Sequence, residues 1–329
     1  MPFRVIETRQ LLQILVIFMI VQFFGLFLSA EIFTGTTFQQ VNSAQVINSA
    51  TSALLYIVYI IIFTAVIIMV FKFYKGDKFF VLLEGAVVFI SSFFVFLVLS
   101  GLLTNMTLFS VGGNTITTNF VIAVGAAIVL IVAKNKFPRL RNATTMIASV
   151  GVGLVLGVSF SFLAAMIFMM VLAVYDFIAV FVTKHMITMA KAMSSRNLAF
   201  LVGVNEVEAI PKSKFSKSEI EEYKKEMKGM KLSPVLADFY KKDMYPVAAR
   251  VELGAGDLAV PLMVSIAAYK VYLNFVLSFF ITLGAVLGLL ITMYIIKKQK
   301  RPLPAIPPLL FGVVVGISLY ILLFNVLNI

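Results

Sequence analysis

Two aspartates within long apolar segments are the residues of this sequence that are best suited to chemistry. Asp176 is the only charged residue between Thr144 and Thr183, and Asp257 follows the short run Gly254-Ala255-Gly256. A charged side chain at membrane depth costs roughly 2.5 to 3.5 kcal/mol even on mild insertion scales, so such a residue is a functional-site hypothesis by default. If the two side chains meet, one carboxylate can take a proton from water while the other, protonated, polarises an electrophile.

The composition indicates a polytopic helical membrane protein. Of the 329 residues, 61% are hydrophobic and 13% are charged, and the mean hydropathy is +1.04. Several apolar runs reach the ~20 residues that a helix needs to cross a bilayer. The chain has no cysteine and a single histidine, His185, which excludes a thiol nucleophile and a multi-histidine metal site. We therefore expect chemistry that needs no metal and no organic cofactor.

The predicted fold is all-α, with nine transmembrane helices. Six of them are expected within 1–183, followed by a polar cytoplasmic loop over 184–250 and by three helices within 251–329. The expected spans are Leu11–Ala30, Ala53–Phe71, Phe79–Leu103, Thr115–Ala133, Thr144 to a turn at Gly157–Ser161, Phe162–Thr183, Leu253–Ala268, Tyr272–Ile296, and Pro304 to the C-terminus.

The distribution of basic residues supports this count. With a cytoplasmic N-terminus, the segments on the cytoplasmic side hold 26 of the 27 lysines and arginines, and only Lys270 lies outside. Because cytoplasmic segments carry an excess of positive charge, the pattern predicts an N-terminus inside and a C-terminus outside. The formal net charge of +12 is then mainly this bias, and no nucleic-acid partner is needed to explain it.

The same topology predicts that the two aspartates lie at one depth. Asp176 stands eight residues before Lys184 at the end of its span, and Asp257 stands seven residues after Arg250 at the start of the next. At ~1.5 Å per residue the two side chains are about 12 and 10 Å from the cytoplasmic ends of their helices. Two carboxylates in one low-dielectric site share a proton, as in aspartic proteases.

Three motifs in order resemble the presenilin family of intramembrane aspartyl proteases. Tyr175-Asp176, Gly254-Ala255-Gly256-Asp257 and Pro304-Ala305-Ile306-Pro307 are similar to the YD, GxGD and PAL motifs of that family. Each motif alone is a weak signal, but their order and the nine spans extend the resemblance over essentially the whole chain. Short loops and the absence of cysteine are most similar to archaeal presenilin homologues. Two departures are Ala255, where presenilins usually have Leu, and Ile306, which replaces the Leu of PAL.

The resemblance implies an endopeptidase that cuts within transmembrane helices, in the cell membrane of an archaeon or another microbe. It implies that Asp176 and Asp257 are catalytic and that single-span membrane proteins in the lipid bilayer are the substrates. No obligatory partner subunit is expected, and a homo-oligomer stays open. The residues that the resemblance places around the substrate are Tyr175, Gly254, Ala255, Gly256, Pro304, Ala305 and Ile306.

Local chemistry adds three expectations. Pro304 and Pro307 should prevent a regular helix from starting before about Pro308, which leaves an extended strip of backbone beside the aspartates. Gly254 and Gly256 should let a substrate main chain approach closely. Tyr175 could donate a hydrogen bond near the site, although an aromatic residue on a helix more often packs.

Other positions are expected to be structural or to lie in the polar loop. Gly153 and Gly157 have a spacing typical of close helix packing. Glu84 lies six residues beyond Lys78 and is expected to reach the cytoplasmic interface without a catalytic part. The apolar insert Leu198–Val204 is expected to fold back on the membrane or to be cleaved.

Two other function classes stay open at this point. Intramembrane carboxylates also serve ion- or proton-coupled transporters, and without the third motif transport and proteolysis would stand about equal. A transporter should show inverted repeats, and the two halves of the chain have no clear self-similarity. A passive ion leak or a scaffold is also compatible with the sequence. The signal-peptide-peptidase branch shares two motifs but is expected with inverted catalytic spans, which the basic residues disfavour.

Overall fold

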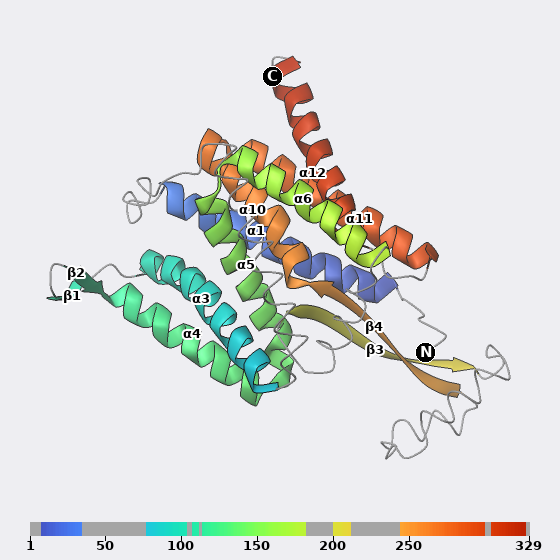
Figure 1. The fold of residues 1–329 in the computed structure, drawn as a ribbon, viewed down its shortest axis with the longest axis horizontal. Helices are drawn as coiled ribbons and strands as arrows, with labels where there is room; N and C mark the ends of the chain where they lie inside the picture. Colours follow the sequence, from blue (N-terminus) through green and yellow to red (C-terminus); the bar gives the residue numbers. More distant parts are fainter. Residues whose placement is uncertain are drawn as a thin grey trace.

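The protein is a helical bundle with two small β ribbons (Figure 1). The computed structural model describes residues 8–34, 77–103, 107–111, 114–181, 200–211, 244–299 and 304–326. The helices are α1 (Thr8–Thr34), α3 (Asp77–Leu103), α4 (Thr118–Lys136), the 3₁₀ turn η2 (Pro138–Leu140), α5 (Arg141–Ser159), α6 (Phe162–Phe181), α10 (Ala255–Tyr272), α11 (Phe275–Gln299), α12 (Ile306–Ile321) and the π-helical turn η4 (Leu322–Val326).

Seven of the described helices are long and apolar enough to cross a membrane, which confirms a multi-pass membrane protein. The expected span Ala53–Phe71 lies outside the described residues. The 18-residue helix α10 is not among the seven, and it carries Asp257, Pro261 and Lys270. The count of nine spans and the orientation of the termini remain predictions.

The all-α prediction omitted two antiparallel β ribbons. Strands β1 (Thr107–Val111) and β2 (Asn114–Thr117) form one, and β3 (Leu201–Pro211) and β4 (Met244–Gly254) form the other, with Leu201 opposite Gly254. Strands β3 and β4 fall within or beside the segment expected to be a polar loop. The pairing joins segments that are far apart in the chain, so neither segment alone carries a periodic signal strong enough to reveal it.

Two helix starts differ from the sequence prediction. Leu253 and Gly254 were expected in the seventh span but end strand β4, and α10 begins at Ala255. Helix α12 begins at Ile306, earlier than the expected Pro308. The reason is that proline is compatible with the first turn of a helix, where its missing N–H would have no intrahelical partner. The predicted turn between the fifth and sixth spans is confirmed by the end of α5 and the start of α6.

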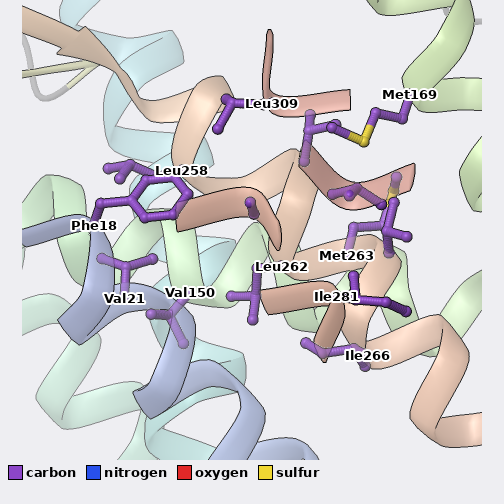
Figure 2. Close-up of a cluster of buried hydrophobic side chains, with 14 of the residues drawn as sticks. Phe18, Val21, Val150, Met169, Leu258, Leu262, Met263, Ile266, Ile281 and Leu309 are labelled. Atoms are coloured by element: carbon purple, nitrogen blue, oxygen red, sulfur yellow. The ribbon is translucent and has the colours of Figure 1, made fainter. Parts of the chain in front are cut away.

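Helix α10 is the centre of the bundle. Every residue from Leu258 to Tyr269 is buried, because α1, α5, α6, α11 and α12 all contact this helix. A helix that is covered on all sides needs no amphipathic pattern. Figure 2 shows Leu258, Leu262 and Met263 of α10 among apolar side chains from the surrounding helices.

Glycines let two of these helices approach α10 closely. A Cβ on Gly25 of α1 would lie 2.4 Å from the side chain of Leu262, and one on Gly153 of α5 would lie 2.7 Å from it. One turn further along α5, a Cβ on Gly157 would lie 2.6 Å from the side chain of Ile266. The interpretation of Gly153 and Gly157 as packing residues is therefore confirmed.

Helices α11 and α12 are held together by backbone contact. A Cβ on Gly312 would lie 2.0 Å from the carbonyl oxygen of Gly284, and a Cβ on Gly288 would lie 2.4 Å from that of Pro308. Gly316 is similarly close to the carbonyl oxygen of Phe280. This contact fixes where the first turn of α12 lies relative to the rest of the bundle.

We predict that Gly312→Ala destabilises the protein, because the added methyl group collides with backbone that cannot rotate away. The expected loss in free energy of unfolding is about 1 to 3 kcal/mol, the usual cost of overpacking. The matched control is Gly125→Ala in α4, where a Cβ meets no atom within 4 Å. Thermal unfolding in detergent should show a lower midpoint for the first variant only. Equal midpoints would contradict the close approach of α11 and α12.

A buried ion pair joins α3 to α4. The side chain of Glu84 is 2% exposed, and Lys134 Nζ donates to its Oε1. Sequence reasoning gave Glu84 a structural part but no partner, and the structure buries its side chain and pairs it with Lys134. Its depth relative to the interface stays a prediction. Removing one member of such a pair leaves the other as a buried, uncompensated charge.

We predict that Glu84→Gln lowers the free energy of unfolding by about 3 to 5 kcal/mol. The double variant Glu84→Met/Lys134→Met should recover most of that loss, because it removes both charges together and fills the same space. A double-mutant cycle of unfolding midpoints, built from Glu84→Met, Lys134→Met and the double variant, measures the coupling. Additive effects of the two single replacements would show that the pair is not energetically coupled.

Candidate active site

The two intramembrane aspartates are both buried, and they belong to neighbouring helices. Asp176 on α6 is 3% exposed and Asp257 on α10 is 8% exposed. Helix α10 contacts α6, and the carboxylates are close enough that the charge of Asp176 acts on Asp257. The structure thus brings together the two residues that the sequence singled out.

Asp257 lies in the first turn of α10, directly after the β ribbon. Gly254 is extended, with φ −67° and ψ 144°, and its N–H donates to Asp257 Oδ2 over 3.3 Å. This is one half of a capping box, since glycine has no side chain to return the bond. A carboxylate in the first helical turn is also stabilised by the helix dipole. The end of the strand thus supplies the hydrogen bond that holds Asp257.

Asp176 is held by the start of α12. The N–H of Ile306 donates to Asp176 Oδ2 over 3.2 Å, and the N–H of Ala305 also faces this carboxylate. Pro304 has no N–H, so these are the first two backbone donors of the strip. Asp176 therefore lies at the N-terminus of a helix other than its own, where the exposed N–H groups and the dipole favour an anion.

The two glycines of the GxGD-like motif have different surroundings. A Cβ on Gly254 would lie 3.1 Å from Asp257 Oδ2, so a larger residue would press on the carboxylate. A Cβ on Gly256 would meet no atom within 4 Å, and this residue is exposed. Ala255 between them donates its N–H to the carbonyl of Phe200 over 2.9 Å, which closes the end of the ribbon. Of these two glycines, Gly256 is thus the one with open space around it among the described residues.

The side chain of Tyr175 does not hydrogen-bond to the two aspartates. Its side chain is 49% exposed, and it makes no hydrogen bond to another residue in the described ranges. Its predicted contact with substrate stays a prediction. Among the strip residues, Pro304 and Ala305 are buried and Ile306 is half-buried.

Sequence reasoning did not single out several residues that support the site. Gln22 in α1 is buried, and its Nε2 donates to the carbonyl of Leu258, the residue after Asp257. Asn142 at the start of α5 exchanges two hydrogen bonds with the backbone of Gly203 in β3. A glutamine within an apolar helix was a visible signal for the first, whereas the contact of Asn142 depends on the unpredicted ribbon.

The described residues contain no group of three His, Cys, Asp or Glu side chains that could hold a metal ion. What the arrangement can do chemically follows from its two carboxylates. Each has backbone N–H donors, and each lies out of bulk water at the junction of a helix with non-helical chain. Such a pair can exchange protons with a water molecule and with a peptide carbonyl group.

Comparison with known proteins supports a shared fold. The chain resembles two crystal structures, each described as a presenilin family intramembrane aspartate protease. One has 19% sequence identity and a TM-score of 0.59, with 94% of this chain and 97% of the other covered. The second has 20% identity and a TM-score of 0.59, with 95% and 97% covered. None of the curated proteins compared with the chain matches it.

A family model shows the relationship more directly than these structures do. The model described as signal-peptide peptidase, presenilin aspartyl protease matches residues 15–326, which is nearly the whole chain. The match includes both aspartates, the GxGD-like turn and the proline strip. The chain therefore belongs to the signal-peptide peptidase and presenilin family of aspartyl proteases, and it is an intramembrane-cleaving aspartic endopeptidase.

Proposed function

We propose that the protein hydrolyses peptide bonds within the transmembrane helices of single-span membrane proteins, and that Asp176 and Asp257 activate the attacking water. The observation that carries this proposal is the pairing of two buried carboxylates from α6 and α10. Each is held by backbone N–H groups and not by a basic side chain among the described contacts. A carboxylate so held can take up and release a proton.

The proposed mechanism uses one proton shared by the pair. The ionised carboxylate accepts a proton from water as the water oxygen bonds to the carbonyl carbon of the substrate. The protonated carboxylic acid donates its proton to the carbonyl oxygen, which gives a neutral tetrahedral diol. Collapse of the diol breaks the C–N bond, and the leaving nitrogen takes a proton from the carboxyl group that received one from water. At the same time the other carboxylate takes the proton of one diol hydroxyl group, whose oxygen becomes the carbonyl oxygen of the new carboxylic acid. The pair again holds one proton.

The substrate must present an extended peptide, because a helical peptide group is enclosed by its own turn. The end of strand β4 at Gly254 lies beside Asp257, and the side of Gly256 is open. The opposite strand of the ribbon, β3, has its outer edge covered at Gly203 by the side chain of Asn142. We place the unwound substrate along the outer edge of β4, where backbone hydrogen bonds can form with any sequence.

The proposed setting is a nine-span protein with its N-terminus inside and its C-terminus outside. The bias of lysine and arginine supports this orientation. We further propose that the protein acts without an obligatory partner subunit, alone or as a homo-oligomer, in the cell membrane of an archaeon or another microbe. Ion- or proton-coupled transport is the alternative use of the aspartates, and membership of a protease family favours proteolysis over it.

We predict that Asp176→Asn and Asp257→Asn each lower the cleavage rate of a single-span membrane peptide by at least about 1,000-fold. Both replacements keep the size of the side chain but remove its ability to exchange a proton. Cleavage by purified protein, followed by mass spectrometry of the products, measures the effect.

Ser265→Ala is the control, because it removes a buried polar group from the same helix, two turns from Asp257. It should keep most of the activity. Cleavage that persists in either asparagine variant would contradict the proposed catalytic role of the two aspartates, provided that the variant unfolds near the wild-type temperature.

We predict that the two motif glycines affect different kinetic constants. Gly254→Ala should lower kcat by about tenfold, because its Cβ presses on Asp257 Oδ2 and displaces the carboxylate. Gly256→Ala should raise KM by about tenfold with little change in kcat, because its methyl group enters only the open side where substrate approaches. Steady-state cleavage kinetics separate the two. If both variants change KM alone, Gly254 does not act through Asp257.

A further inference from the structure

Helix α1 reaches the active site through one buried amide. The side chain of Gln22 is 0% exposed, and its Nε2 donates to the carbonyl oxygen of Leu258 over 2.7 Å. Leu258 follows Asp257 directly, and 236 residues separate it from Gln22 in the chain. The contact therefore joins the first helix of the protein to the turn that carries one of the two aspartates.

The first turns of α10 have a weakness that this bond offsets. Pro261 lies inside the helix and has no N–H, so the carbonyl of Asp257 lacks the usual donor four residues on. The proline ring also crowds that carbonyl, which is a common origin of helix kinks. The turn from Asp257 to Pro261 thus has fewer backbone hydrogen bonds within the helix than the rest of α10. A donor from a neighbouring helix at the adjacent carbonyl limits its movement.

The position of α1 against α10 is itself well fixed. Gly25, three residues after Gln22, contacts Leu262, which is four residues after Leu258. Phe18, one turn before Gln22, is fully buried in the same cluster, and Figure 2 shows it beside Leu258. Gln22 therefore lies between two packing contacts, and the place of its amide is set by both of them.

The amide of Gln22 is poorly suited to stabilising the fold. Its Oε1 is buried and accepts no hydrogen bond from any residue in the described part of the chain. Burying an amide that makes only one of its hydrogen bonds has a desolvation cost, and this cost cancels much of the free energy that the one bond contributes. An apolar side chain of equal length should therefore be tolerated by the fold. Any effect of the amide should appear in the orientation of the turn that it holds.

We propose that Gln22 is a positioning residue of the active site. By holding the carbonyl of Leu258, its amide fixes the first turn of α10 and directs the Asp257 carboxylate toward Asp176. This inference rests on the proposed role of the two aspartates. It assigns Gln22 no contact with substrate, so its loss should lower kcat and leave KM unchanged.

Two variants of Gln22 test this role. Gln22→Met keeps the length of the side chain and removes the donor, so it should lower kcat at least about tenfold while KM and the unfolding temperature stay near wild type. Gln22→Glu can donate to Leu258 only while its carboxyl group is protonated. Its activity should approach that of the wild type at pH values where the introduced carboxyl group is protonated, and should fall where this group is ionised.

The control for the first variant is Gln13→Met. It makes the same chemical change in the same helix, and Gln13 makes no hydrogen bond to α10 among the described residues. Among the described residues, the carboxyl groups on elements packed against α1 are Asp257 on α10, Glu252 on β4 and Glu84 on α3, and α1 itself carries Glu31. All of them, and Asp176 on α6, are present in every variant. Differences between the pH profiles therefore report the introduced carboxyl group.

Wild-type kcat in Gln22→Met would overturn the proposal. So would equal losses of activity and unfolding temperature in both variants, since these indicate a purely structural role. The proposed function has its own test, because only the Asp176→Asn and Asp257→Asn variants decide it. If those two variants are inactive and Gln22→Met is fully active, the dyad stands and the role of Gln22 fails.

Discussion

The fold must bury two carboxylates away from water and still give each of them hydrogen-bond donors. An ionised group inside the membrane requires hydrogen bonds from the protein, and in this chain they come from the backbone. The N–H of Gly254 donates to Asp257, and the N–H of Ile306 donates to Asp176. Inside a bundle of helices, free backbone N–H groups occur mainly where a helix begins. The fold must therefore start two helices at the same place in the bundle.

The chain begins these two helices in different ways. At α10 a β strand ends and its last residue becomes the N-cap, whereas at α12 a proline strip leads into the first turn. Non-helical backbone at membrane depth is tolerated only where protein covers it. The covering is supplied by close helix packing. Glycines on α11 and α12 bring their backbones into contact, and this contact fixes the strip that faces Asp176.

Sequence reasoning predicted the chemistry better than it predicted the framework. Asp176 and Asp257 stood out because a charge in an apolar run is rare and costly, and the structure places both in one buried region. The extents of α5 and α6 followed from hydrophobic length alone. The β3–β4 ribbon did not, because strand pairing between distant segments depends on contacts that no single segment encodes.

Two other features depended on which surfaces meet. The pairing of Glu84 with Lys134 requires α3 and α4 to be neighbours, and a sequence gives no direct measure of that. Gly284/Gly288 and Gly312/Gly316 also have the four-residue spacing of helix contacts, but sequence reasoning singled out only Gly153 and Gly157. The structure shows that the first two rows face each other. Local patterns thus reveal which residues are unusual, and the partners of those residues follow from the packing.

The contact between Asn142 and Gly203 has a consequence for self-association. A two-stranded ribbon has two edges, and a chain with both edges open can join copies of itself into a filament without end. The carboxamide of Asn142 bonds to both the N–H and the C=O of Gly203, as a neighbouring strand would. Where that edge is covered, the ribbons of two copies can pair only through their β4 edges. Such pairing of two identical edges gives a dimer and leaves no open edge for a third copy. A single asparagine therefore opposes filament formation through this edge of the ribbon.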